Sequence, residues 1–290
     1  MKIKSVIVTV LKLVFLTVLL FICFSIAAKV AAMPERNIAP QEAQEVALLL
    51  LGICFAFTLT LSYPIIRSQW RGWRLILTMM AAFFGVMTFL SQIESLIFLN
   101  YLVKIISLEL IGKIILQGAV LTVLFIPLAV GVWGKMRGAS APSPKLQLPW
   151  REWAWKLAVL SVSYFIIYLS FGYFVAWQSP AVREYYQGLI MPAWMPFFQL
   201  VRALVWVAIA VPVIKMMDGR AWEAGLAVGL LYAVLMSFLL LMPENVVMPD
   251  GVRLAHFREV CTSNFLFGWL VVGVLNLGKK AKKGRIDIQM

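Results

Sequence analysis

The chain is dominated by eight apolar stretches of roughly twenty residues each, separated by short polar segments. An α-helix of about 20 residues is ~30 Å long, which matches the hydrocarbon core of a bilayer. With 62% hydrophobic and 13% charged residues, the chain has more apolar surface than a water-soluble fold of 290 residues can hide. We therefore predict an all-α, polytopic membrane helix bundle of about eight transmembrane helices. The expected spans are about Val6 to Val30, Glu45 to Ile66, Leu75 to Ile93, Ile111 to Trp133, Trp153 to Trp177, Phe197 to Lys215, Trp222 to Met242 and Val260 to Leu277.

The first apolar stretch also resembles a secretory signal peptide, because Lys2 and Lys4 precede it and Val30-Ala31-Ala32 could be cleaved. Its apolar run from Ser5 to Ala28 is interrupted only by Lys12. That run is longer than the ~7–15 residues of a usual signal core. We therefore expect a retained first helix, with cleavage as the alternative.

The basic residues fall mostly on one side when the loops are assigned alternately to the two faces of the membrane. That side receives most of the 26 Lys and Arg residues, whereas most of the 13 acidic residues fall on the other side. Lysine and arginine are retained in the cytoplasm by the positive-inside rule. The pattern predicts a multi-pass protein of the inner (cell) membrane with both termini in the cytoplasm.

The net charge of +13 is consequently a topology signal. A nucleic-acid-binding protein of this charge would need a soluble basic domain, and the sequence offers none. The lysine-rich tail, residues 279–290, is expected to contact anionic lipid in addition to the bilayer itself.

A polar segment rich in proline and serine divides the chain into two sets of four spans. We expect a first membrane half over residues 1–137, a cytoplasmic linker over 138–150 and a second membrane half over 151–278. The halves resemble each other, and four spans per half would make them parallel repeats. Coincidence in a sequence rich in Leu, Phe and Met is the alternative. The matching features are Pro64 and Pro212, Trp73 and Trp222, Met87-Thr88-Phe89-Leu90 and Met236-Ser237-Phe238-Leu239, Glu94 and Glu244, and Gly131-Val132 and Gly273-Val274.

Several polar side chains fall at the outer ends of the predicted spans, where they could form an outward-facing pocket. His256 is the only histidine, and its spacing to Glu259 places both on one helical face. An unperturbed imidazole titrates near neutral pH, so such a pair could carry a proton or hold a ligand. A histidine at a helix entrance is also a common capping residue. The candidate pocket residues are Glu94, Arg202, His256, Glu259 and Asn264.

Each pocket residue also has a simpler interpretation. Glu94 could end a helix among the lipid headgroups. Arg202, one turn inside its span, could extend its charge toward the interface, or it could bind an acidic side chain or an anionic solute. The loop from Gln178 to Pro196 is rich in Tyr and Trp and could pack on the bundle rim, and Ile97 to Leu110 could form an amphipathic interfacial helix.

Known catalytic and cofactor-binding sequence patterns are missing from the chain, and Cys23, Cys54 and Cys261 are isolated. We expect no metal and no cofactor, and no residue stands out as catalytic. Three function classes stay open: a small-solute or ion transporter, which the helices and the repeat favour slightly; a membrane-embedded enzyme acting at the outer face; and a non-catalytic component that binds a partner protein or lipid. The sequence leans against an enzyme.

Overall fold

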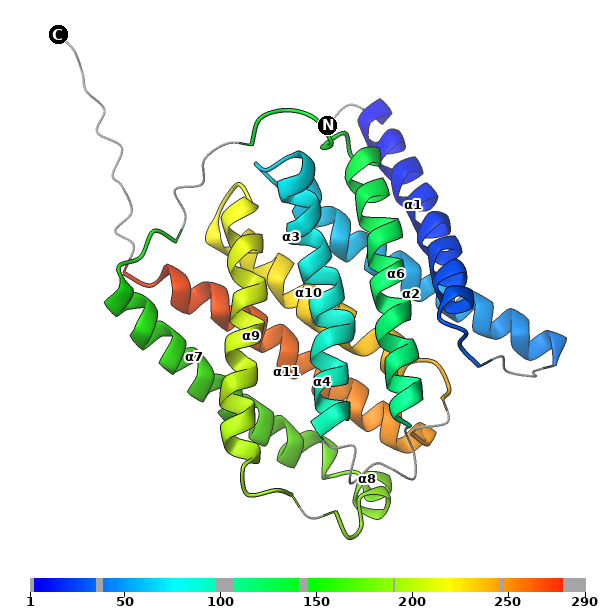
Figure 1. Ribbon diagram of the computed structural model, residues 1–290, viewed down its shortest axis with the longest axis vertical. Coiled ribbons are helices and arrows are strands. Elements are labelled where there is room, and N and C mark those ends of the chain that lie inside the picture. The colour runs from blue at the N-terminus through cyan, green and yellow to red at the C-terminus, as the bar shows by residue number, and fades with distance from the viewer. Residues whose placement is uncertain are drawn as a thin grey trace.

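The computed structural model describes residues 3–34, 39–97, 107–140, 146–189, 191–245 and 248–278. These residues form a bundle of long helices that run between two ends (Figure 1). Eight of the helices in the described part are long and apolar enough to cross a membrane, which confirms the predicted all-α membrane bundle. The protein is therefore a multi-pass membrane protein.

The helices follow one another in the expected order. They are α1 (Ile3–Val30), α2 (Pro40–Ile66), α3 (Gly72–Phe84), the π-helical turn η1 (Gly85–Phe89), α4 (Leu90–Ile97), α6 (Leu108–Val132), α7 (Trp150–Phe171), the π-helical turn η2 (Gly172–Ala176), the short α8 (Pro180–Tyr185), α9 (Met195–Met216), α10 (Ala221–Leu241) and α11 (Asp250–Asn276). The third span is thus made of α3, η1 and α4, and the fifth of α7 and η2. Proline begins α2 and α8, where its missing N–H costs nothing.

The last helix begins at Asp250, ten residues before the predicted start of its span. Its polar first turns continue the helix because their side chains are paired along it. Arg253 lies 2.6 Å from Asp250, and His256 lies 2.7 Å from Glu259. The predicted interfacial helix from 97 to 110 falls largely on residues 98–106, and the linker centre and the basic tail fall on 141–145 and 279–290, all outside the described residues.

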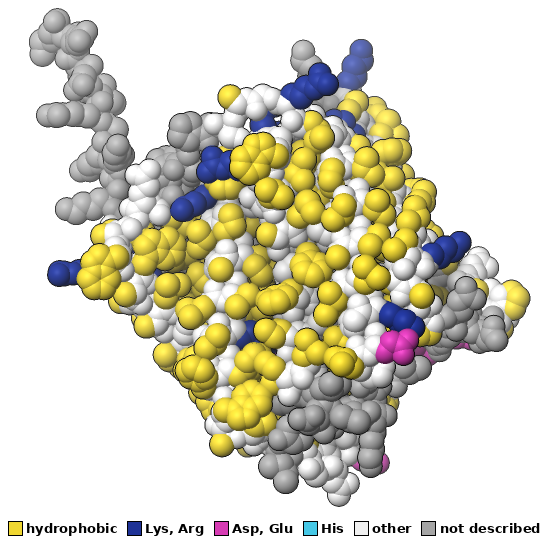
Figure 2. Space-filling view, viewed as in Figure 1, with side chains coloured by type: hydrophobic (Ala, Val, Ile, Leu, Met, Phe, Trp, Pro, Cys, Tyr) yellow, Lys and Arg dark blue, Asp and Glu magenta, His cyan; other side chains and the backbone are white. Residues whose placement is uncertain are grey.

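We call the two ends of the bundle the near end and the far end. The near end holds the starts of α1, α3, α7 and α10 and the ends of α2, α6, α9 and α11, and the far end holds α8 (Figure 1). Apolar side chains cover most of the face seen in Figure 2, and Lys and Arg gather toward the near end at its top. Helix α10 is the most central of the spans, with 72% of its apolar window buried.

Helices α10 and α11 approach each other closely through small residues. A Cβ atom on Gly268 would lie 2.8 Å from the Cα atom of Gly229, so only glycine fits there. This contact confirms the tight packing that Gly225 and Gly229 predict from their spacing along α10.

The two halves pack in the same pattern. In the first half α1 contacts α2 and α6, and α3 contacts α6; in the second half α7 contacts α9 and α11, and α10 contacts α11. Between the halves, α2 packs on α10 while α9 packs on α3. Helices that hold the same place in the order of each half therefore contact helices that also hold the same place.

Aromatic contacts repeat in the two halves as well. In the first half a ring of α2 meets a ring of α3, which meets a ring of α6; in the second half the series runs through α9, α10 and α11. The first series is Phe57, Phe83 and Phe125, and the second is Trp206, Tyr232 and Phe267. Such edge, tilted and stacked contacts stabilise a core beyond the area they bury.

Two backbone hydrogen bonds join the halves at the near end. The N–H of Gln69 donates to the carbonyl of Met216, and the N–H of Asp218 donates to the carbonyl of Arg67, both at 2.7 Å. Gln69 and Asp218 stand 149 positions apart, as do Arg67 and Met216. Exchanging each residue for the one 149 positions away therefore turns one of the two hydrogen bonds into the other.

Candidate functional site

A polar stripe lies on the side of α9 that faces the bundle. Gln199, Arg202 and Trp206 follow one another at helical spacing in the far half of this helix, and all three are buried. The Arg202 side chain is only 4% exposed, which is unusual for a charged residue. The charge does not reach the interface, so Arg202 needs partners inside the protein.

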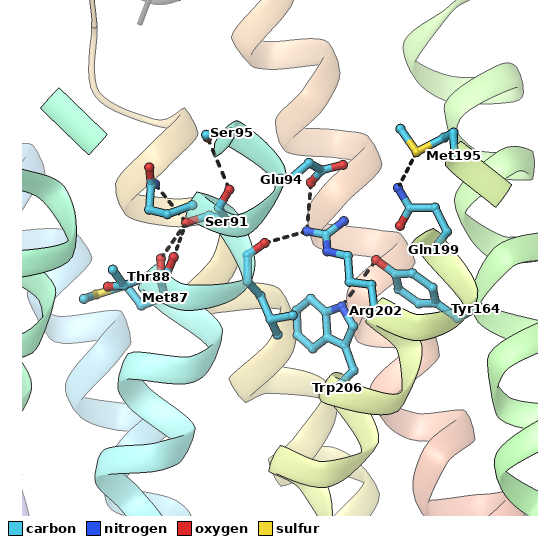
Figure 3. A network of polar contacts seen from close by, with 12 residues as sticks. Met87, Thr88, Ser91, Glu94, Ser95, Tyr164, Met195, Gln199, Arg202 and Trp206 are labelled. Atoms are coloured by element: carbon cyan, nitrogen blue, oxygen red, sulfur yellow. Dashed lines mark hydrogen bonds and ion pairs between the residues drawn. The ribbon is translucent and has the colours of Figure 1, made fainter. Parts of the chain in front are cut away.

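Glu94 and a backbone carbonyl supply those partners (Figure 3). Nη2 of Arg202 lies 2.8 Å from Oε2 of Glu94 and donates to the carbonyl of Leu90 at 2.9 Å. Both partners belong to α4, so the ion pair joins the first half of the chain to the second. A buried charge persists in a low-dielectric interior only when it is paired in this way.

The π-helical turn η1 precedes these contacts in the third span. The N–H of Leu90 donates to the carbonyl of Gly85, five residues earlier. This wider turn disturbs the regular bond pattern, and the Ser91 hydroxyl donates to the carbonyls of Met87 and Thr88 at 3.2 and 2.9 Å. π-turns within α-helices occur frequently at functional sites.

Two buried polar atoms on α9 have no hydrogen-bond partner in the described structure. They are Nε of Arg202 and Oε1 of Gln199. The amide nitrogen of Gln199 has only the thioether sulfur of Met195, at 3.4 Å, and sulfur is a weak acceptor. Leaving such groups unpaired costs about 1–3 kcal/mol each. The site therefore has unused hydrogen-bonding capacity.

Tyrosines of α7 complete the site on its other side. The Tyr164 hydroxyl accepts a hydrogen bond from Nε1 of Trp206 at 3.3 Å. Tyr164 and Tyr168 both lie within electrostatic range of Arg202, Glu94 and Glu259. They thus lie near both the Arg202 pair and Glu259, which belongs to a second polar group.

That second group is a hydrogen-bonded chain at the far end. The Tyr186 hydroxyl lies 3.1 Å from Nε2 of His256, and Nδ1 of His256 lies 2.7 Å from Oε2 of Glu259. Oε1 of Glu259 would lie 3.6 Å from a Cβ atom on Gly172, the first residue of η2, so the carboxylate packs directly on this second π-turn. Tyr186 follows α8, within the loop that was predicted to pack on the bundle rim.

The directions of the hydrogen bonds among Tyr186, His256 and Glu259 depend on where the protons lie. Burial raises the pKa of Tyr186, and Tyr185, Glu259 and Glu94 raise it further. The phenol therefore keeps its proton. With the imidazole proton on Nδ1, His256 donates to Glu259 and accepts the hydrogen bond of the Tyr186 hydroxyl at Nε2, which is the assignment that we adopt for these three groups.

The structure brings four of the five predicted pocket residues into two pairs. Glu94 contacts Arg202, and the predicted common face of His256 and Glu259 is confirmed by their contact. Asn264 is buried about two turns further along α11, and no hydrogen bond joins it to the other four. Whether the five form a ligand pocket stays a prediction.

Several residues of this region were not predicted as part of it. Gln199, Tyr164 and Tyr168 are the main ones. Gln199 had a signal in the sequence, because a neutral polar residue three positions before Arg202 lies on the same helical face of an apolar span. The tyrosines had none, because tyrosine is common at membrane interfaces for other reasons. Among the described residues, no three His, Cys, Asp or Glu side chains come together as metal ligands.

A shallow apolar groove lies elsewhere in the bundle, between α1, α2, α6 and α10. Its walls contain no charged side chain. The lining residues are Leu20, Phe24, Leu50, Ile53, Cys54, Phe57, Leu121 and Leu239.

Comparisons of the chain with known protein families, with characterised proteins and with solved structures found no match.

Proposed function

We propose that the protein is a transporter of small solutes or ions, with an outward-facing polar pocket around Arg202 and the His256–Glu259 pair. One observation carries this proposal. The buried ion pair between Arg202 and Glu94 lies in the far half of a membrane bundle, where the two halves of the chain meet. Ionisable groups inside membrane spans are costly and mark the paths of ions and solutes.

We also propose that residues 1–137 and 151–278 are parallel repeats. The equivalent packing of the helices, the two aromatic series and the bonds exchanged by a shift of 149 positions support this. In addition, the fourth helix of each half is followed by a glycine with positive φ, Gly134 or Gly278. Transporters with repeats commonly bind their substrate where the repeats meet, which is where Arg202 contacts Glu94.

A lysine of the first helix in each half supports the same correspondence. Nζ of Lys12 lies 5.3 Å from the ring centre of Trp133, at the end of α6. Nζ of Lys156 donates to the carbonyls of Leu275 and Leu277, at the end of α11. Each first helix thus places a cation at the end of its own fourth helix.

We propose that the protein lies in the inner (cell) membrane. In the proposed orientation the near end faces the cytoplasm. Basic residues crowd this end, where burial and the charge of Arg71 lower the pKa of Lys135. The basic tail, residues 279–290, would then contact anionic lipid. Reporter fusions at Ser143 and at the C-terminus should both read cytoplasmic, and an external signal at either would overturn the orientation.

Flux into liposomes tests the transport proposal. Purified protein is reconstituted, and uptake of a panel of labelled organic acids, amino acids, sugars and inorganic cations is compared with uptake by empty liposomes. We expect at least one class to enter faster, and Lys113→Gln to leave that flux unchanged, because Lys113 pairs with Glu109 on α6 outside the site. If folded protein moves nothing on the panel beyond the empty-liposome rate, the proposal fails.

The Tyr186–His256–Glu259 chain favours a second candidate, a membrane-embedded enzyme acting at the outer face. A histidine oriented by a carboxylate is the usual arrangement of a general base. This alternative expects detergent-solubilised protein to convert a substrate chemically, and it expects His256→Gln to abolish that conversion. The transporter proposal expects no chemical conversion.

A further inference from the structure

We infer that the Arg202 site binds a small hydroxy-carboxylate, and that one proton enters the protein with it. The inference rests on the proposed transport function, because it names the substrate class of the same site. It is carried by the two unpaired buried atoms of α9 and by the charge balance around Arg202.

The guanidinium of Arg202 is only partly used. Its contacts with Glu94 and with the carbonyl of Leu90 both run through Nη2, and Nε is buried without a partner. A guanidinium is a planar fork whose edges match the two oxygens of a carboxylate. A ligand carboxylate would therefore satisfy Nε and bind Arg202 more completely than Glu94 does.

Gln199 specifies what else the ligand must carry. It lies three positions before Arg202, and Figure 3 shows both side chains beside Tyr164. Oε1 of Gln199 is a buried acceptor that lacks a donor. A hydroxyl group next to the ligand carboxylate would supply that donor. Unsubstituted carboxylates would leave Oε1 unpaired.

Charge balance requires the proton. Arg202 and Glu94 are neutral as a pair, so an added carboxylate would leave a net negative charge inside the bundle, which is costly. The titratable groups that face Glu94 are Arg202 from α9, Tyr164 and Tyr168 from α7, Tyr186 after α8 and Glu259 from α11. On α6, Lys113 is already paired with Glu109.

Among the described residues, Arg202 is the one cation that faces Glu94, so the excess charge is removed by protonating the displaced carboxylate. A hydronium ion of the solvent gives its proton to Glu94, so one O–H bond of the hydronium ion breaks as one forms on the carboxyl group. The ligand carboxylate takes the place of Glu94 on the guanidinium, and no other covalent bond changes. Tyr186, His256 and Glu259 form a hydrogen-bonded chain along which such a proton could arrive from the far end.

Calorimetric titration of the detergent-solubilised full chain tests the inference. The probe is lactate, with acetate lacking the donor and lactamide lacking the carboxylate. Buffers of different ionisation enthalpy report the protons taken up. We expect saturable binding of lactate with uptake of one proton, and an affinity that falls about tenfold for each pH unit once Glu94 is ionised in the free protein. Acetate should bind at least about tenfold more weakly, and lactamide should not bind.

Two variants keep the test independent of folding. Glu94→Gln should bind without proton uptake and with an affinity that no longer depends on pH. The double variant Glu94→Gln with Arg202→Gln buries no charge and should fold but not bind. Lys113→Gln, outside the site, should bind like the wild type.

Three results would overturn the inference: no saturation by any of the carboxylates with folded protein, binding that survives in the double variant, or binding without proton uptake in the wild type. Its failure differs from failure of the transport proposal. Carboxylate binding without flux in liposomes would refute transport and leave the site standing, whereas flux of other solutes without carboxylate binding would refute only the inference.

Discussion

The polar cluster around Arg202 and the apolar groove around Ile53 occupy equivalent places under the proposed repeat. A shift of 149 positions carries Leu50, Ile53 and Phe57 of the groove onto Gln199, Arg202 and Trp206. Counted from the lysine that each first helix places at the end of its fourth helix, Leu20 and Phe24 correspond to Tyr164 and Tyr168. Five of the eight residues that line the groove thus have a polar or amphipathic counterpart.

The fourth helices of the two halves also differ in their ionisable groups. Counted back from Gly131 and Gly273, Ile114 and Gln117 stand where the second half has His256 and Glu259. Under the proposed repeat, one helix arrangement therefore accommodates both an apolar groove and a cluster of paired charges. On that proposal the charges are not needed to hold the helices in place, which is why we assign them a function.

The largest effect is expected from removing the buried cation. Arg202→Leu leaves Glu94 without its partner, which typically costs about 3–5 kcal/mol. Ile53→Val at the equivalent place in the groove should cost only about 0.5–1.5 kcal/mol. Unfolding in detergent measures both. Adding Glu94→Leu to Arg202→Leu should recover most of the loss, and if it does not, the pair is not the reason for the difference.

A smaller difference is expected between the two lysines of the first helices. Lys156 is fully buried, donates to the backbone carbonyls of Leu275 and Leu277 and pairs with Glu152 at 3.1 Å, so Lys156→Met should cost about 1–3 kcal/mol. Within the described part of the protein Lys12 has only its contact with Trp133, and Lys12→Met should cost about 0.5–1 kcal/mol. Equal losses in thermal unfolding would contradict the structural comparison.

The smallest loss of stability is expected at the hydrogen-bonded chain of Tyr186, His256 and Glu259. There, the position of the imidazole proton is the sharper measurement. Tyr186→Phe removes one hydrogen bond and should cost about 0.5–1.5 kcal/mol. Because the protein has a single histidine, ¹⁵N labelling gives the NMR signals of one imidazole only. Its signals should show the Nδ1–H form in the neutral wild type. In Tyr186→Phe the imidazole should lose its preference for the Nδ1–H form. A neutral wild-type imidazole protonated on Nε2 would refute the direction assigned to the Tyr186–His256 hydrogen bond.

Much of the fold followed from the sequence because lipid imposes a simple rule. Each span needs about twenty apolar residues, so the eight spans could be located by composition alone. The π-turns η1 and η2 leave no mark in hydropathy, and the early start of α11 depends on side-chain pairs such as Asp250 with Arg253. These pairs satisfy polar groups that hydropathy counts as reasons to end a span.

The candidate site was predictable only in part. Arg202 and Glu94 could be singled out because charge is rare inside apolar spans. Their partnership could not, since α4 and α9 are more than a hundred residues apart in sequence and meet only through tertiary packing. His256 and Glu259 were easier, because i,i+3 spacing on one helix fixes their contact without knowledge of the fold.

Flux through two matched sets of variants tests the central claim most directly. Proteoliposomes containing the wild type, the neutral pair Glu94→Gln with Arg202→Gln, and the groove variant Ile53→Val are compared for uptake of the solute that the wild type carries. The account predicts that uptake is lost in the neutral pair and unchanged in the groove variant, with all three proteins folded. Undiminished uptake by the neutral pair would contradict it.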